Sequence, residues 1–289
     1  METDAAFRGL DRMSVAAAVG HDRMRRKISA IRRAGFACVF AVAALACDAA
    51  RGADTPTIAV ASNLQFALPE IAAAFKRASG KDVRLAFGSS GNFRRQIAEG
   101  APFELFLAAD TVFVAALAGE QRTVDEGVVY AIGRLALFIP NGSPVKADSR
   151  LSDVARALRD GRLRKFAIAN PELAPYGEAA RQVLQHAGLW NEIEPHIVFG
   201  ENISQAAQFA ASGAAQGGIV AYSLVRSPTM AGQGTYVLLP SSAHAPLAQK
   251  MVLLKNSGAT ARAFYGFLQQ PVARGIFERY GFELPSAPR

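Results

Sequence analysis

The chain has 289 residues, of which 51% are hydrophobic and 19% charged, a composition typical of one large globular domain or two of ordinary size. Its formal charge of +8 is spread without a basic run beyond the N-terminal segment, which argues against a nucleic-acid partner. Because its two cysteines, Cys38 and Cys47, both lie near the N-terminus, the rest of the chain has no disulfide framework, cysteine metal site or cysteine nucleophile.

Residues 1–53 have the layout of a secretory signal peptide. RMRRKISAIRR supplies a positive n-region, and AGFACVFAVAALA supplies an apolar run too short to cross a membrane comfortably. Small residues follow, and cleavage after Ala49 or after Ala53 fits the pattern equally. We therefore expect export to the periplasm, with two alternatives left open: acylation of Cys47 as a lipoprotein, or retention of the apolar run as an anchor.

After Asp54, short apolar strands alternate with helical segments. Strands are expected at 57–62, 83–88, 103–110, 135–144, 217–222 and 250–256, and helices at 66–79, 92–99, 151–161, 260–269 and 272–280. Segments 165–188 and 196–213 each follow the plan of strand, turn and helix. This alternation predicts an α/β fold with mostly parallel sheets covered by helices on both faces.

The two sets of strands predict two α/β lobes with a ligand cleft between them. We expect lobe 1 to comprise residues 54–133 plus 248–289, and lobe 2 to comprise residues 134–247. No internal repeat and no low-complexity linker separates the two sets.

Four strand-to-helix junctions are rich in small and polar residues. They are Ser62-Asn63-Leu64, Gly88-Ser89-Ser90-Gly91, Ala174-Pro175-Tyr176-Gly177 and Gly200-Glu201-Asn202-Ile203. Such turns lie at the carboxyl ends of strands, where open α/β sheets bind ligands, and each helix N-terminus carries about half a positive charge. If two come from each lobe, their N–H groups and hydroxyls form a cage of donors for a small oxyanion. The alternative is that they are ordinary capped turns.

The same segments resemble the periplasmic molybdate-binding proteins, the soluble components of molybdate ABC transporters. The resemblance begins in ASNLQFALPEIAAAFKRASGKDVRLAFGSSGNFRRQIAEGAPFELFLAAD and continues in NPELAPYGEAARQVLQHAGLW, in the GIV strand and in VARGIFERYGFELP. It covers most of residues 57–284. It implies a periplasmic-binding-protein type II fold, in which two lobes joined by strands that cross twice close on the ligand.

The resemblance also implies which residues contact the anion. By position in the motifs they are Asn63, Ser90, Tyr176 and Ile203, the last through its backbone N–H, with Ser62 and Ser89 in the same turns. Some family members carry a ligand-contacting Tyr directly after the GIV strand, where this chain has Ala221 followed by Tyr222. Because a shift of one residue turns a strand side chain to the opposite face, we expect Tyr222 to lie outside the site and Tyr176 to supply the hydroxyl.

Neighbouring polar residues have simpler interpretations. Ser89 is expected to cap the helix that follows it. Asp110 is expected to be a helix N-cap or a hinge residue, since a carboxylate beside a dianion is repulsive. Arg94 and Arg95 are expected on a solvated helix face, from which they can also steer anions towards the cleft at low salt.

The sequence gives little support to an enzyme. Gly88-Ser89-Ser90-Gly91 lacks the spacing of a nucleophile elbow, and no phosphate-binding or dinucleotide-binding glycine motif is present. His186, His196 and His244 are widely separated and form no metal-binding pair. We therefore predict a protein without catalytic residues and without a cofactor, whose metal is bound only as the oxyanion.

The predicted function is capture of molybdate, and of tungstate, for an ABC transporter permease in the inner membrane by a monomeric protein. Three alternatives stay open. One is a binding protein for another oxyanion, such as sulfate, phosphate or chromate, or for a chelated metal; the others are a regulatory ligand-sensing module and a hydrolase. A sensing module normally carries a DNA-binding helix-turn-helix, and the sequence shows an export signal instead.

Overall fold

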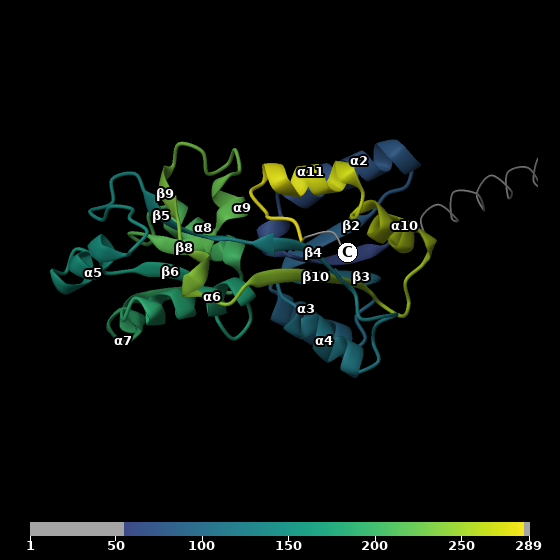
Figure 1. The fold of residues 1–289 in the computed structure, drawn as a ribbon, viewed down its shortest axis with the longest axis horizontal. Coiled ribbons are helices and arrows are strands. Elements are labelled where there is room, and N and C mark those ends of the chain that lie inside the picture. Colours follow the sequence, from purple (N-terminus) through teal and green to yellow (C-terminus); the bar gives the residue numbers. More distant parts are fainter. Residues whose placement is uncertain (1–54, 286–289) are drawn as a thin grey trace, which may run out of the picture. The chain divides into compact units, whose positions relative to one another are not determined.

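The computed structural model describes residues 55–285, and their strands form two five-stranded sheets (Figure 1). The first has the order β2-β1-β3-β10-β4 and contains β1 (Thr57–Ala61), β2 (Arg84–Gly88), β3 (Leu105–Leu107), β4 (Val128–Gly133) and β10 (Leu247–Leu253). The second has the order β7-β6-β8-β5-β9 and contains β5 (Leu135–Pro140), β6 (Phe166–Ala169), β7 (Ile197–Gly200), β8 (Gly218–Ala221) and β9 (Gly234–Leu238). The expected signal peptide of residues 1–53 lies outside the described residues.

The two sheets repeat one pairing plan. In the first, β1 pairs in parallel with β2 and β3, and β10 pairs antiparallel with β3 and β4. In the second, β6 pairs in parallel with β7 and β8, and β5 pairs antiparallel with β8 and β9. The predicted α/β fold with two sheets is therefore confirmed, with half of the pairings antiparallel. Strands β4 and β9, which the sequence pattern did not predict, account for two of these pairings.

Helices cover both faces of each sheet, as predicted (Figure 1). On the first sheet, one face carries α2 (Ala67–Ser79), α10 (Ala259–Phe267) and α11 (Pro271–Arg279), and the other carries α3 (Ser90–Ala98) and α4 (Val112–Gly119). On the second sheet, α6 (Pro175–His186) and α7 (Trp190–Ile193) lie opposite α8 (Ile203–Ala211) and α9 (Tyr222–Val225), and α5 (Ser152–Arg159) follows β5. Three short 3₁₀ helices complete the order: η1 (Ser62–Leu64), η2 (Glu194–His196) and η3 (Ser241–Ala243).

Apolar periodicity explains why these helices dock where they do. In α2, Ile71, Ala74 and Phe75 follow helical spacing and are buried against the sheet. The Phe75 ring packs on Phe264 of α10 with 5.1 Å between ring centroids, which joins two helices far apart in the sequence. Gly80 ends α2 at a φ of 70°, a left-handed conformation that glycine adopts without strain.

The chain passes between the two sheets twice. The first passage runs through Arg134, between β4 and β5, and the second through residues 239–246, between β9 and β10. We use lobe 1 for the first sheet with its helices and lobe 2 for the second. The predicted boundary at 133/134 lies at the first passage, and the one at 247/248 lies one residue into β10. The division into separate domains stays a prediction.

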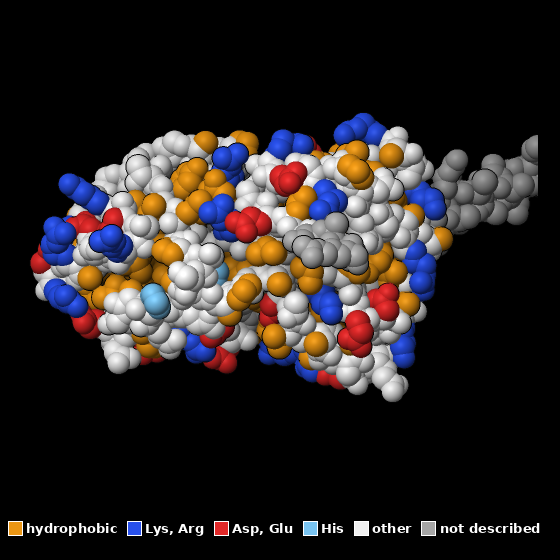
Figure 2. Space-filling view, viewed as in Figure 1, with side chains coloured by type: hydrophobic (Ala, Val, Ile, Leu, Met, Phe, Trp, Pro, Cys, Tyr) orange, Lys and Arg blue, Asp and Glu red, His pale blue; other side chains and the backbone are white. Residues whose placement is uncertain are grey.

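Charged side chains are dispersed over the molecule. On the face shown in Figure 2, Lys and Arg side chains are interspersed with Asp and Glu, without the continuous basic stripe that follows a nucleic-acid backbone. None of the helices within residues 55–285 has both the length and the apolar character needed to cross a membrane.

Candidate functional site

A small cavity of about 10 Å³ lies where the predicted junctions meet. Its volume is about that of the space needed for one water molecule. The lining residues come from both lobes: Ala61, Ser62, Asn63, Gly88, Ser89, Ser90, Ala109, Ala174, Pro175, Tyr176, Asn202 and Ile203. The structure thus brings together all six residues that were predicted to bind the anion. They lie up to 141 residues apart in the chain (Ser62 to Ile203).

Three α-helices begin at the cavity. They are α3, whose first residue is Ser90, α6, whose first residue is Pro175, and α8, whose first residue is Ile203. Within residues 55–285, no hydrogen-bond acceptor is found for the backbone N–H groups of Ser90, Tyr176 and Ile203. The N–H groups of a first helical turn have no intrahelical partner, and helix N-termini attract anions.

The fourth junction differs from the expectation. Ser62, Asn63 and Leu64 form the 3₁₀ helix η1, and α2 begins only at Ala67. The sequence pattern predicted a helix at 66–79, which agrees with α2, but it did not predict the 3₁₀ helix before it. This junction therefore contributes the polar groups of a short turn to the cavity.

The Ser90 hydroxyl accepts a hydrogen bond from the backbone and keeps its own proton free to donate. Its Oγ accepts a hydrogen bond from the Ala109 N–H at 3.0 Å, and the residue is 1% exposed. A hydroxyl has one proton to donate, so Ser90 can still give a hydrogen bond to an acceptor in the cavity. Ser89, by contrast, caps α3, since its Oγ accepts from the Asn92 N–H at 3.4 Å, as predicted.

Contacts between the two lobes enclose the cavity. The Gly91 N–H donates to the Leu173 carbonyl at 2.9 Å, which joins α3 to the loop before α6. On the other side, the Ser204 hydroxyl donates to the Ser62 carbonyl, and the Ser223 hydroxyl donates to the Asn63 carbonyl, both at 2.9 Å. The lobes therefore touch around the cavity, which buries its lining residues.

Tyr176 and Asn63, which both line the cavity, contact each other through their side chains. The Tyr176 hydroxyl accepts from Gln249 Nε2 at 2.9 Å and from Asn63 Nδ2 at 3.4 Å. Burial raises the pKa of the Tyr176 hydroxyl above its ordinary value, so the group is neutral and keeps its proton. Gln249 was not predicted from the sequence, although one buried polar residue within the apolar strand LAQKMVL was a usable signal.

Charged side chains are absent from the lining of the cavity, whose polar groups are hydroxyls, side-chain amides and backbone amides. Within residues 55–285, no cluster of three or more His, Cys, Asp or Glu side chains is placed to hold a metal ion. The arrangement therefore fits a small anion that needs hydrogen-bond donors and no counter-charge.

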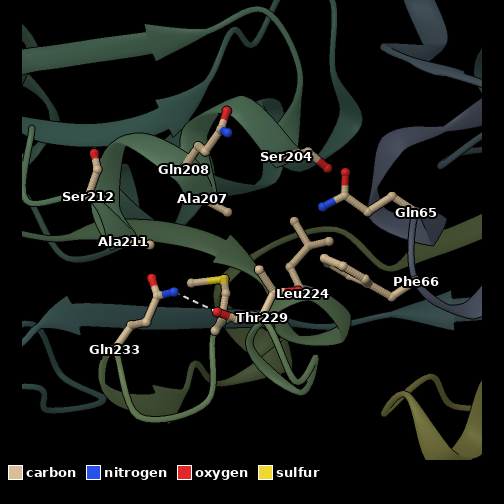
Figure 3. A pocket seen from close by; sticks show the side chains of 11 residues that line it. Gln65, Phe66, Ser204, Ala207, Gln208, Ala211, Ser212, Leu224, Thr229 and Gln233 are labelled. Carbon is tan, nitrogen blue, oxygen red and sulfur yellow. Dashed lines mark hydrogen bonds between the residues drawn. The ribbon is translucent and has the colours of Figure 1, made fainter.

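A larger pocket of about 340 Å³ is also lined by residues of both lobes (Figure 3). Gln65 and Phe66 of lobe 1 face Ser204, Leu224 and Thr229 of lobe 2 across it. Its lining has no charged side chain, and it lacks the three convergent helix N-termini of the smaller cavity. The smaller cavity is therefore the better candidate for binding an anion.

Tyr222 lies outside the cavity lining, at the first position of α9. Its ring packs so closely on Gly281 of lobe 1 that a Cβ atom there would meet it at 2.5 Å. The guanidinium groups of Arg134 and Arg226 lie 5.5 and 5.9 Å from the ring centroid. The ring thus packs between the lobes, at a contact separate from the candidate site.

Asp110 and the two arginines of α3 are also placed away from the lining. Asp110 Oδ1 accepts from the Phe113 N–H of the first turn of α4 at 3.2 Å, one residue before the N-cap position, which Thr111 occupies. Arg94 forms an ion pair with Glu120, and Arg95 donates to Asn92 Oδ1 on the surface of α3. Exposed pairs of this kind contribute little to stability.

Comparison with known proteins agrees with this geometry. Residues 56–283 match the bacterial extracellular solute-binding protein family. The chain belongs to this family. The solute-binding protein described here is 38% identical over 259 residues to the molybdate-binding protein ModA of Rhodobacter capsulatus, an alignment that covers 86% of this chain and 96% of that protein.

One sequence and one solved structure from Azotobacter vinelandii are also similar to this solute-binding protein. The molybdate-binding protein ModA of that organism is 36% identical over 243 residues, covering 83% of this chain and 93% of the relative. The solved structure of an Azotobacter vinelandii periplasmic molybdate-binding protein superposes with a TM-score of 0.72 at 30% identity, covering 80% of this chain and 100% of that one. The predicted resemblance and the predicted fold are thereby confirmed.

The Asp110 carboxyl predicts a pH-dependent stability. Burial raises its pKa to about 6, against about 3.9 in an unfolded chain. The folded protein therefore holds this proton more tightly, and the stability it contributes below pH 4 is lost as the pH rises through 6. We expect Asp110→Asn, which keeps the capping oxygen, to be more stable than the wild type by about 1–3 kcal/mol at pH 7.5 and equal to it near pH 4.

Urea unfolding at pH 4, 5.5 and 7.5 measures this difference. Asp82→Asn serves as the control, because a hydrogen bond from Lys76 lowers the pKa of Asp82 and the pH trend should have the opposite sign. A stability difference between Asp110→Asn and the wild type that is constant with pH would contradict the prediction.

Proposed function

We propose that this solute-binding protein captures molybdate outside the cytoplasm and delivers it to the permease of an ABC transporter. The observation that carries the proposal is the meeting of three helix N-termini and the Ser90 hydroxyl at one cavity without charged side chains. Relatives at 38% and 36% identity, named molybdate-binding proteins, support the choice of ion.

A cage built only of donors selects anions by protonation. Molybdate, tungstate and sulfate are fully deprotonated at neutral pH, so each of their oxygens accepts hydrogen bonds. Monohydrogen phosphate carries a proton that would face another donor, which is unfavourable. Sulfate has the same charge as molybdate but is smaller and should fit the cage loosely. We therefore propose that tungstate is bound along with molybdate, and sulfate more weakly.

Hinge closure of the two lobes is the proposed mechanism. A ligand shifts the equilibrium between open and closed forms only through contacts that differ between them. Donors from lobe 1, such as Ser90, and from lobe 2, such as the Tyr176 and Ile203 N–H groups, reach one anion only when the lobes meet. The permease would then recognise the closed protein.

The remaining assignments follow from this role. We propose a monomeric periplasmic protein, exported by its N-terminal segment, without catalytic residues and without a resident cofactor. Its metal enters and leaves as the oxyanion. The alternative ligands, another oxyanion such as sulfate or a chelated metal, are outcomes of the titration below.

Calorimetric titration of the protein lacking residues 1–53 with molybdate, tungstate, sulfate and phosphate tests the function. We expect tight binding of molybdate and tungstate, weak binding of sulfate and no binding of phosphate. Tight binding of sulfate with weak binding of molybdate would replace the proposed ligand, and no heat with any of the four anions would reject an oxyanion-binding role.

Ser90→Ala removes the hydroxyl donor while leaving the backbone N–H in place. A hydrogen bond to a charged group contributes about 1.5–3 kcal/mol, so we expect molybdate to bind about 10- to 150-fold more weakly. Ser79→Ala, which removes a hydroxyl at the far end of α2, is the matched control and should leave affinity unchanged. Equal affinity in Ser90→Ala and the wild type would remove Ser90 from the site.

Gly91→Ala tests closure. A Cβ atom at this position would lie 2.9 Å from the Leu173 carbonyl oxygen across the interface between the lobes. Relieving such overpacking costs about 1–3 kcal/mol, so closure and with it molybdate affinity should fall by about 5- to 150-fold. Gly119→Ala, at the end of α4 with nothing within 4 Å of the added carbon, is the control. Unchanged affinity in Gly91→Ala would show that binding does not need this contact.

A further inference from the structure

Gln249 is the centre of a buried polar cluster between the lobes. It lies in β10 and is fully buried. Gln249 Oε1 accepts from Asn63 Nδ2 at 3.0 Å and from the Tyr130 hydroxyl at 2.9 Å, while Gln249 Nε2 donates to the Tyr176 hydroxyl at 2.9 Å. One glutamine amide thereby links lobe 1, through Asn63 and Tyr130, to Tyr176 of lobe 2.

This arrangement leaves two polar groups of the cluster unmatched. Asn63 Oδ1 is buried and has no hydrogen-bond donor within residues 55–285. The Tyr176 hydroxyl accepts from two amides, and its own proton has no acceptor within the same residues. Buried polar groups are rarely left unpaired, so an arrangement that satisfies both is strongly favoured.

Turning both side-chain amides by 180° gives Asn63 Oδ1 a donor and the Tyr176 proton an acceptor, and leaves only the Asn63 NH₂ group without a partner within residues 55–285. Gln249 Nε2 then donates to Asn63 Oδ1 and to the Tyr130 oxygen, and Gln249 Oε1 accepts the Tyr176 proton, over the same interatomic distances. The Tyr130 hydroxyl donates to the Ala108 carbonyl at 3.2 Å. The exchange is sterically neutral because the nitrogen and oxygen ends of an amide have nearly the same size.

The exchange also changes what Asn63 presents. In the first arrangement the free end of its amide is an oxygen, which repels an anion. In the second the free end is the NH₂ group, a donor, on a residue that lines the cavity. A bound oxyanion therefore stabilises the second arrangement, and the second arrangement favours a bound oxyanion.

We propose that Gln249 is a positioning residue for anion binding, which sets the orientation of the Asn63 amide and never touches the ion. The inference rests on the proposed oxyanion-binding function. Because Tyr176 comes from lobe 2, its hydrogen bond to Gln249 forms only when the lobes approach. The cluster thus couples closure of the lobes to the presentation of the Asn63 donor.

A double-mutant cycle with Gln249→Met and Asn63→Ala tests this coupling. Methionine has a similar length and cannot orient an amide by hydrogen bonds. We expect Gln249→Met to weaken molybdate binding by about tenfold or more in the wild type, and by less than about threefold when Asn63 is already Ala. A purely structural role of Gln249 would weaken binding by the same factor in both backgrounds, which would overturn the inference, as would unchanged affinity of Gln249→Met.

Two controls make the result specific. Gln216→Met makes the same chemical change in lobe 2, where Gln216 Oε1 accepts hydrogen bonds from the backbone N–H groups of Arg164 and Lys165. This variant should leave molybdate affinity unchanged. A wild-type protein that binds none of the four anions would reject the proposed function itself, and this inference with it. If the wild type binds molybdate and the effects of Gln249→Met and Asn63→Ala on its affinity are additive, only the role of Gln249 is rejected.

Gln249→Glu tests the same point if the methionine variant does not fold. An ionised carboxylate only accepts hydrogen bonds, so it holds the Asn63 NH₂ group away from the cavity, whereas the protonated carboxyl can donate to Asn63 Oδ1. We expect its affinity, as a ratio to the wild type at the same pH, to rise at least threefold from pH 8 to pH 5. The titratable groups Asp110, Tyr130 and Tyr176 are present in both the variant and the wild type, so the affinity ratio cancels their effects. An affinity ratio that is constant with pH would overturn the inference.

Discussion

Unpaired backbone N–H groups at the N-termini of α3, α6 and α8 are the constraint on which the candidate site depends. Each group exists because the first turn of a helix has no intrahelical acceptor, and each is directed by the strand that precedes its helix. Since the helices belong to different lobes, the groups share a cavity only when the lobes are in contact. In the proposed function, binding and closure are therefore one event.

The surroundings of the cavity keep those groups free for an anion. Three neighbouring polar groups have partners of their own: Ser89 caps α3, Asn202 caps α8, and the Ser90 oxygen accepts a hydrogen bond from the Ala109 N–H. Ionised side chains stay outside the lining, so neither a carboxylate repels the anion nor a lysine or arginine binds it indiscriminately. In the proposed site, selectivity among oxyanions therefore depends on the number of hydrogen-bond donors and on their spacing.

Local sequence signals were sufficient for much of this. Alternating strands and helices predicted the α/β fold, Gly80 marked the end of α2, and the small polar junctions marked the ends of strands. The strands β4 and β9 were missed although they are no shorter than most of the predicted strands. Both flank the passages between lobes, where pairing with β10 and β5 stabilises them more than their own composition does. The 3₁₀ turn at Ser62 was missed because its start resembles a helix cap.

The amino-acid sequence alone predicted which residues end strands and begin helices, because turn and capping preferences depend on residues that are neighbours in the chain. The folded chain settled which of those ends face one another, and it alone revealed Gln249 between Asn63, Tyr130 and Tyr176. That cluster joins positions up to 186 residues apart, between Asn63 and Gln249. Hydrogen bonds between residues so far apart depend on how the two sheets pack. The periodicity of the sequence does not predict how distant segments pack against each other.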